Sequence, residues 1–214
     1  MRHSIDDVIF DCDSTLSSIE GIDELALRSG HGERVAALTH AAMNGEVPLE
    51  RVYAERLNII RPALADVEAI GQRYCQTEVP GARAVIAQLH SLGRRVFIVS
   101  GGIYQAVLPF ALSLGIAAED VRAVRLVFDK HGGYMGFAAS PLTTSTGKRE
   151  TVRALRTAGR RAMLVGDGAS DLAAKDEVDL FVGFGGVVAR DVVRAGAHVF
   201  IDGASLLPIL DLAR

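Results

Sequence analysis

The chain has 214 residues, and 49% of them are hydrophobic. This length suits one α/β core with a small inserted domain, and this apolar content is typical of a parallel sheet buried on both faces. A disordered or fibrous protein is excluded. The formal net charge of −3 provides no positive excess for a nucleic-acid backbone or an anionic membrane, so we expect neither partner.

Cysteine usage and the N-terminal segment indicate the cellular compartment. Cys12 and Cys75 are far apart and form no CxxC pattern, which indicates free thiols in a reducing cytosol rather than a disulfide framework or a zinc site. Asp6 and Asp7 come before an apolar run could reach the length of a signal peptide. Residues 96–118 contain no charged side chain, but serine, glycine and proline inside this stretch indicate strand, loop and buried helix instead of a membrane span. We expect a cytoplasmic protein, either a monomer or a homodimer.

Short apolar runs alternate with helical patterns along most of the chain. Buried strands are predicted at residues 8–10, 96–99, 162–165, 180–182 and 198–201. Helices are predicted between the later strands, at residues 82–92 and 148–158, and a glycine follows each of them. This alternation predicts a Rossmann-like core with a parallel sheet.

The first two predicted strands are separated by far more residues than a crossover needs. Residues 16–75 contain no strand pattern and divide into helical segments, with helices predicted at residues 33–43, 49–60 and 63–74. We therefore predict a discontinuous catalytic core of residues 1–15 and 76–214, and a helical cap domain of residues 16–75. A short β-hairpin is predicted from residues 124–128 and 134–137, with Tyr134 packing on the surface.

Two pairs of carboxylates follow predicted strands. Asp11 and Asp13 come directly after the first strand, and Asp167 and Asp171 come after the third. Each pair alone would be ordinary loop composition, but ligands bind at the carboxyl ends of strands in open parallel sheets. Because residues two apart share one face of an extended chain, we expect Asp11 and Asp13 to converge on one point. Such an all-oxygen cluster suits Mg²⁺, whereas zinc would require histidine or cysteine.

Two further segments have residues suited to binding a phosphate group. Ser100, Gly101 and Gly102 follow the second predicted strand, where their N–H groups and hydroxyl could surround a phosphate. Lys148, at the start of a predicted helix, could supply a positive charge to it. Taken singly, a lysine such as Lys148 is more often a solvated surface residue.

The order of these motifs resembles the haloacid dehalogenase-like phosphohydrolase superfamily. The resemblance spans residues 8–201 and includes a helical insert after the first motif. It implies that Asp11 is the nucleophile and that Asp13 is the general acid and base. It also implies that Mg²⁺ is held by Asp11, Asp167 and the Asp13 carbonyl, with Asp171 orienting these ligands.

Residues 10–15 and 20–26 together resemble the phosphoserine phosphatase family more closely. That resemblance implies a small phosphorylated amino acid, O-phosphoserine, as substrate. Glu20 would bind its ammonium group, Arg56 its carboxylate, and Met43 would line the pocket. The other implied substrate-binding residues are Ser100, Gly101, Gly102, Lys148 and Ser170. Leu49 departs from the family's usual aromatic residue and Ser170 from its usual Asn or Thr, and these two departures concern substrate specificity more than the chemistry.

Arg56 also has support from helical periodicity. In the helix predicted at residues 49–60, a 3.6-residue period places Arg56 inside an apolar stripe. A guanidinium on the buried side of a helix needs an anion, which could be a structural Asp or Glu or the carboxylate of a ligand.

Other functions are compatible with the same motifs. The substrate could be another small phosphomonoester, such as phosphohomoserine or a sugar phosphate. The acceptor of the phosphoryl group could be a molecule other than water, as in a phosphotransferase. A non-enzymatic phospho-acceptor module would share the acidic cluster, although a cap domain has no purpose in such a module.

Overall fold

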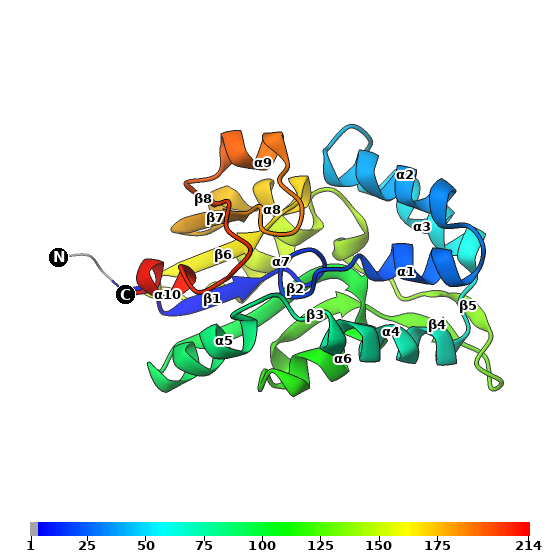
Figure 1. Cartoon of the computed structure of the whole chain (residues 1–214), viewed down its shortest axis with the longest axis horizontal. Coiled ribbons are helices and arrows are strands. Elements are labelled where there is room, and N and C mark those ends of the chain that lie inside the picture. Colours follow the sequence, from blue (N-terminus) through cyan, green and yellow to red (C-terminus); the bar gives the residue numbers. More distant parts are fainter. Residues whose placement is uncertain (1–3) are drawn as a thin grey trace.

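The computed structural model describes residues 4–214, and a six-stranded sheet in the order β3-β2-β1-β6-β7-β8 forms its centre (Figure 1). All neighbouring strands of this sheet run parallel. The strands are β1 Asp7–Phe10, β2 Arg95–Ile103, β3 Val121–Val124, β6 Ala162–Gly166, β7 Leu180–Phe184 and β8 Val199–Ile201. The predicted α/β class with a Rossmann-like parallel sheet is confirmed. β1 and β6 are buried along their whole length, as continuous apolar runs in a central position require.

Two details of the predicted sheet were wrong. β3 was not predicted as a separate strand, because as an edge strand it buries only its first and last residues and lacks a continuous apolar run. β2 was predicted to end at Val99 but extends to Ile103, so Ser100 and the two glycines lie within the strand and not beyond it. The pairing of β2 with β3 shifts register between Val99 and Ile103.

Helices cover both faces of the sheet (Figure 1). α5 (Ala82–Ser91) and α6 (Tyr104–Ser113) lie on one face, and α8 (Ala169–Leu172) and α9 (Asp191–Gly196) lie on the other. From β1 the chain proceeds to β2 and β3 on one side, whereas β6 leads to β7 and β8 on the opposite side. β1 and β6 therefore form the topological switch point, where open α/β sheets bind ligands.

Two further helices and three short 3₁₀ segments lie outside residues 21–76 in the described part of the chain. They are α7 (Gly147–Leu155), α10 (Ile209–Leu212) and the short 3₁₀ segments Ala118–Asp120, Pro141–Thr143 and Lys175–Glu177. α7 ends three residues before the predicted position because Arg156 adopts an extended backbone. Within residues 4–214, no helix is both long and apolar enough to cross a membrane.

Four helices, which we call the helical insertion, lie beyond the carboxyl ends of the strands (Figure 1). They are α1 Gly21–Arg28, α2 Gly32–Met43, α3 Leu49–Ile60 and α4 Leu64–Gln76. The last three agree with the helices predicted at residues 33–43, 49–60 and 63–74 to within two residues. The two connections to the core run side by side, since Ser17 pairs with Glu78 in an antiparallel bridge and the Val79 N–H donates to the Leu16 carbonyl at 2.9 Å. The division into a core and a cap domain stays a prediction.

The hairpin of β4 (Leu126–Phe128) and β5 (Tyr134–Phe137) packs against the helical insertion. The carbonyl of Gly132 accepts a hydrogen bond of 2.9 Å from the Leu64 N–H at the start of α4. Tyr134 is only 7% exposed. The Arg61 guanidinium carbon lies over the Tyr134 ring, 5.9 Å from the ring centroid. Surface packing was therefore the wrong expectation for Tyr134.

Candidate active site

Three buried carboxylates meet where β1 and β6 end. One oxygen from each of Asp11, Asp167 and Asp171 lies within 4.8 Å of the others. The parallel register of β1 and β6 explains the approach of the first two, since the Asp11 N–H donates to the Val165 carbonyl at 2.9 Å. Asp171 fits closely because Gly166 lacks a side chain: a Cβ there would lie 2.2 Å from the Asp171 Cγ.

Lys148 is buried against this carboxylate cluster. Its Nζ lies 2.7 Å from the Asp11 Oδ2 and 2.7 Å from the Asp171 Oδ1. Burial alone would lower the pKa of Lys148, but the charges of Asp11 and Asp171 raise it above its ordinary value, so the side chain stays a cation. Because Lys148 is only 4% exposed, a solvated surface position is excluded.

The positive charge near the cluster is too small to keep all of its carboxylates ionised at their ordinary pKa values. Burial, followed by the charge of Asp11, raises the pKa of Asp167 to about 7 and that of Asp171 to about 8. A raised carboxyl pKa means that the environment favours an added proton or cation. Carboxylate oxygens are the donors that hard divalent cations prefer, so these three residues could hold a metal ion.

Asp13 lies beside the cluster, but its side chain is not part of it. Its Oδ1 accepts hydrogen bonds from the Tyr74 hydroxyl at 2.5 Å and from the Gly21 N–H at 2.7 Å. Burial and the charge of Asp11 raise the pKa of Asp13 to about 6. The expected convergence of Asp11 and Asp13 is therefore met only in the sense that both side chains line one cavity.

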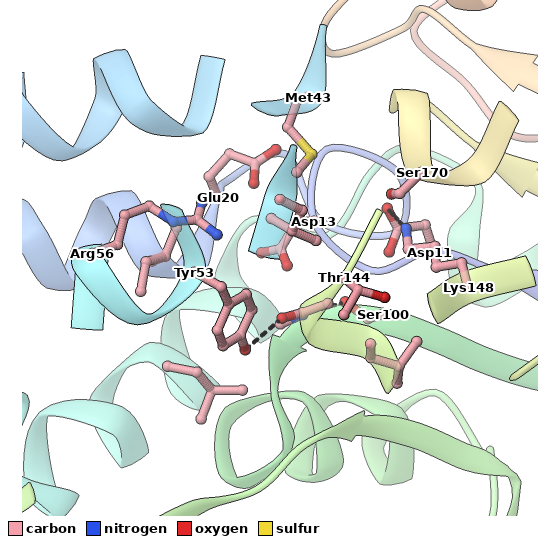
Figure 2. A pocket seen from close by; sticks show the side chains of 16 residues that line it. Asp11, Asp13, Glu20, Met43, Tyr53, Arg56, Ser100, Thr144, Lys148 and Ser170 are labelled. Atoms are coloured by element: carbon pink, nitrogen blue, oxygen red, sulfur yellow. Dashed lines mark hydrogen bonds and ion pairs between the residues drawn. The ribbon is translucent and has the colours of Figure 1, made fainter. Parts of the chain in front are cut away.

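That cavity contains all the residues for which catalysis or substrate binding was predicted (Figure 2). They are Asp11, Asp13, Glu20, Met43, Arg56, Ser100, Gly101, Gly102, Lys148 and Ser170. Arg56 and Tyr53 stand at one end of the cavity, whereas Asp11 and Lys148 stand at the other. Asp167 and Asp171 do not line the cavity but adjoin this second end. Both belong to the carboxylate cluster with Asp11, and Asp171 also pairs with Lys148.

Arg56 lies on the buried side of α3, as its apolar stripe predicts. Its Nη1 donates to the Thr39 hydroxyl at 3.1 Å, while its buried Nε has no hydrogen-bond partner. Among the ion pairs of residues 4–214, none within 4.0 Å involves Arg56. Burial lowers its pKa, and an unpaired buried donor is costly, so this guanidinium favours binding an anion in the cavity.

Glu20 is an acidic group of the cavity that directly precedes α1, at the start of the helical insertion. It is half-buried and accepts a hydrogen bond of 2.7 Å from the Ser14 hydroxyl. Burial, and then the charges of Asp13 and Asp167, raise the pKa of Glu20 well above its ordinary value. A positively charged ligand group would relieve this repulsion.

The β2 segment forms another wall of the cavity. The Ser100 hydroxyl accepts the Gly102 N–H at 3.0 Å, and the Gly101 carbonyl accepts the Tyr53 hydroxyl at 2.9 Å. Position 102 has no room for a side chain, because a Cβ there would lie 2.7 Å from the Asp13 Oδ2.

Arg190 is a buried residue of the site that sequence analysis missed. Its Nε donates to the Asp167 Oδ2 at 3.2 Å, and its Nη1 donates to the Asn44 Oδ1 of the helical insertion at 3.1 Å. No motif surrounds Arg190 in the sequence, so only the fold shows its position. Tyr53 could have been found, because it lies in the same apolar stripe as Arg56.

Comparisons with known proteins agree with this geometry. Residues 5–175 match the haloacid dehalogenase-like hydrolase family. The human phosphoserine phosphatase is 37% identical over 202 residues, which cover 93% of this chain and 90% of the human protein. A phospho-aspartyl intermediate analogue of phosphoserine phosphatase has a TM-score of 0.88 at 28% identity, covering 99% of this chain and 100% of the other. A substrate-bound phosphoserine phosphatase complex also has a TM-score of 0.88, at 27% identity and with 100% coverage of both chains.

These matches leave no support for a non-enzymatic phospho-acceptor module. The chain is a phosphoric monoester hydrolase that belongs to the haloacid dehalogenase-like hydrolases and, among them, to the phosphoserine phosphatase family.

Proposed function

We propose that this chain is a Mg²⁺-dependent phosphatase that hydrolyses O-phosphoserine through an aspartyl-phosphate on Asp11. The polarity of the cavity is the observation that carries the proposal. The buried guanidinium of Arg56, whose Nε has no hydrogen-bond partner, stands at one end, and Asp11 with Lys148 stands at the other (Figure 2). A ligand with a carboxylate at one end and a phosphate at the other matches this arrangement.

The substrate's three charged groups each have a complementary partner. Arg56 binds the carboxylate, Glu20 binds the ammonium group and Met43 covers the carbon chain between them. Lys148, the hydroxyls of Ser100 and Ser170, and the backbone of Gly101 and Gly102 surround the phosphate. The name of the human relative and the substrate-bound phosphoserine phosphatase complex favour the same substrate.

The reaction begins with an Asp11 carboxylate oxygen attacking phosphorus. As the Asp11–phosphorus bond forms, the bond from phosphorus to the serine oxygen breaks, and Asp13 gives that oxygen a proton. Asp13 then takes a proton from a water molecule, whose oxygen attacks phosphorus and releases phosphate, so that the Asp11 carboxylate is restored. Lys148 offsets the charge of the phosphoryl oxygens in both steps.

Asp11, Asp167 and the main-chain carbonyl of Asp13 would hold Mg²⁺, with Asp171 orienting these ligands. When bound, the ion supplies positive charge to the phosphoryl oxygens. The raised pKa values of Asp167 and Asp171 support a cation at this position, and the all-oxygen donor set supports Mg²⁺ over a softer metal. The helical insertion acts as a cap that excludes bulk water from the reaction.

The test is phosphate release from a panel of phosphorylated amino acids and sugars, with and without Mg²⁺. We expect multiple turnovers, preference for O-phosphoserine and loss of activity in a chelator. A preference for phosphohomoserine or for a sugar phosphate would keep the chemistry and replace the substrate. A rate that depends on an added alcohol acceptor would indicate a phosphotransferase. The absence of turnover on every ester would overturn the proposal.

A further inference from the structure

Tyr74 contacts Asp13 without reaching the cavity. It is 1% exposed, near the end of α4, and its hydroxyl donates to the Asp13 Oδ1 at 2.5 Å. Its ring stacks on Phe110 of α6, with ring centroids 5.8 Å apart and planes at 26°. Tyr74 does not line the cavity, so it is not positioned to touch a substrate there.

Gly21 supplies the second donor to the same carboxylate oxygen. Its N–H donates to the Asp13 Oδ1 at 2.7 Å. The Tyr74 hydroxyl fits against Gly21 only because that residue has no side chain, since a Cβ there would lie 2.1 Å from the hydroxyl oxygen. The three groups therefore form one close-packed arrangement.

The two oxygens of Asp13 consequently differ. Oδ1 accepts two hydrogen bonds, which occupy its lone pairs, while Oδ2 lies against Gly102, a residue that lines the cavity. A proton that Asp13 gives or takes must therefore be carried by Oδ2. Rotation of the carboxyl group would break both donor contacts at once.

The two donors come from opposite ends of the helical insertion. Gly21 begins α1, shortly after the chain enters the insertion, and Tyr74 is close to the end of α4, where the chain leaves it. The orientation of Asp13 thus depends on both connections between the insertion and the core.

We propose that Tyr74 is a positioning residue, which fixes the Asp13 Oδ1 so that Oδ2 faces the leaving oxygen of the substrate. This inference rests on the proposed function, because it requires Asp13 to be the general acid. It predicts that loss of the Tyr74 hydroxyl lowers kcat/KM, which reports formation of the aspartyl-phosphate, only for substrates whose leaving group needs a proton.

The test compares Tyr74→Phe with the unchanged protein on O-phosphoserine and on acetyl phosphate, whose acetate leaves as a stable anion. The variant keeps the ring and its stacking on Phe110 and loses only the hydroxyl. We expect kcat/KM for phosphoserine to fall by about 10- to 100-fold, the scale of a misplaced catalytic group. The KM for phosphoserine should change by less than about threefold, because Tyr74 does not line the cavity. The kcat/KM for acetyl phosphate should also change by less than about threefold, because it reports only the steps up to the first irreversible one, and acetate leaves without a proton.

Two further variants make the result specific. Gly21→Ala displaces the Tyr74 hydroxyl from the other side, so it should show the same selective loss even if Tyr74→Phe folds poorly. Tyr134→Phe also removes the hydroxyl of a largely buried tyrosine, but one that does not line the cavity, and should leave both activities unchanged. In an Asp13→Asn background, Tyr74→Phe should cause no additional loss on phosphoserine.

The outcomes separate this inference from the proposed function. Equal losses on the two substrates, or no loss on phosphoserine, would overturn the role of Tyr74 while leaving the phosphatase intact. If the unchanged protein hydrolyses neither ester, the proposed function itself fails.

Discussion

The Lys148 ammonium nitrogen lies 2.7 Å from the Asp11 Oδ2, and both side chains are almost fully buried. A nucleophile that is paired with a cation in the resting protein approaches a phosphate dianion with less repulsion. The same pair also neutralises part of a carboxylate cluster that would otherwise be unstable, so Lys148 affects both stability and activity.

Replacing Lys148 by methionine should destabilise the protein. The change leaves Asp11 and Asp171 without their cation, and breaking a buried ion pair costs about 3–5 kcal/mol. Excess Mg²⁺ should restore part of this loss, because it supplies positive charge to the same carboxylates. Urea unfolding in a chelator and in Mg²⁺ measures both effects. Lys130→Met is the matched control, since Lys130 is exposed on the hairpin and should change neither value; an equal loss in the two variants would contradict the assignment.

Asp11→Asn should abolish phosphate release while the protein stays folded. The amide is a poor nucleophile, so kcat should fall by at least about 10³-fold, as when other enzymatic nucleophiles are removed. Removal of one charge from a crowded carboxylate cluster reduces repulsion, and unfolding should therefore require no less denaturant in the absence of Mg²⁺. The measurements are phosphate release and urea unfolding of the same preparation. Turnover close to that of the unchanged protein would refute Asp11 as nucleophile.

Without a metal ion, stability should fall as the pH rises. The pKa of Asp167 is raised to about 7 and that of Asp171 to about 8, above the value of about 3.9 in an unfolded chain. Over this interval the folded protein binds more protons than the unfolded chain. The contribution of these groups is therefore complete below about pH 4 and is lost as the pH rises through 7 and 8.

Excess Mg²⁺ should flatten this dependence, because the ion takes the place of the protons. Urea unfolding midpoints between about pH 6 and 8.5, with chelator and with Mg²⁺, provide the comparison. Asp171→Asn should reduce the slope in chelator. Metal-free stability that instead rises over this interval would show that the cluster does not hold protons.

The sequence was sufficient for the centre of the fold and insufficient for its edge. Central strands such as β1 and β6 are buried on both faces, so they appear as unbroken apolar runs. β3 is an edge strand whose middle residues are half-exposed, including Arg122, and no such run marks it. The extended backbone through Ser100, Gly101 and Gly102 was also missed, since these residue types suggest a loop.

For the site, residues in motifs were predictable and residues recruited by packing were not. Asp11 and Asp167 follow strands, and Arg56 interrupts an apolar stripe, so each leaves a local pattern. Arg190 and Tyr74 reach their carboxylate partners only because distant elements pack together. Nothing around either residue in the sequence distinguishes Tyr74 from a core aromatic or Arg190 from a surface cation.

Arg56→Ala should distinguish substrates that differ by one carboxylate. O-phosphoserine and O-phosphoethanolamine share a phosphate and an ammonium group, and only the first has a carboxylate for the unpaired Arg56 Nε. Hydrogen bonds to charged groups contribute about 1.5–3 kcal/mol, so kcat/KM for phosphoserine should fall by roughly 10- to 150-fold. Phosphoethanolamine has no carboxylate to bind the guanidinium, so its kcat/KM should change by less than about threefold.

The matched control for this substitution is Arg51→Ala. Arg51 lies on the exposed side of the same helix, so its loss tests whether removal of any positive charge from α3 lowers the activity. We expect no effect of Arg51→Ala on either ester. If Arg56→Ala reduced hydrolysis of both esters equally, Arg56 would support the fold of the cavity and would not recognise the carboxylate. The amino-acid substrate would then lose its main physical support, whereas the chemistry at Asp11 would be unaffected.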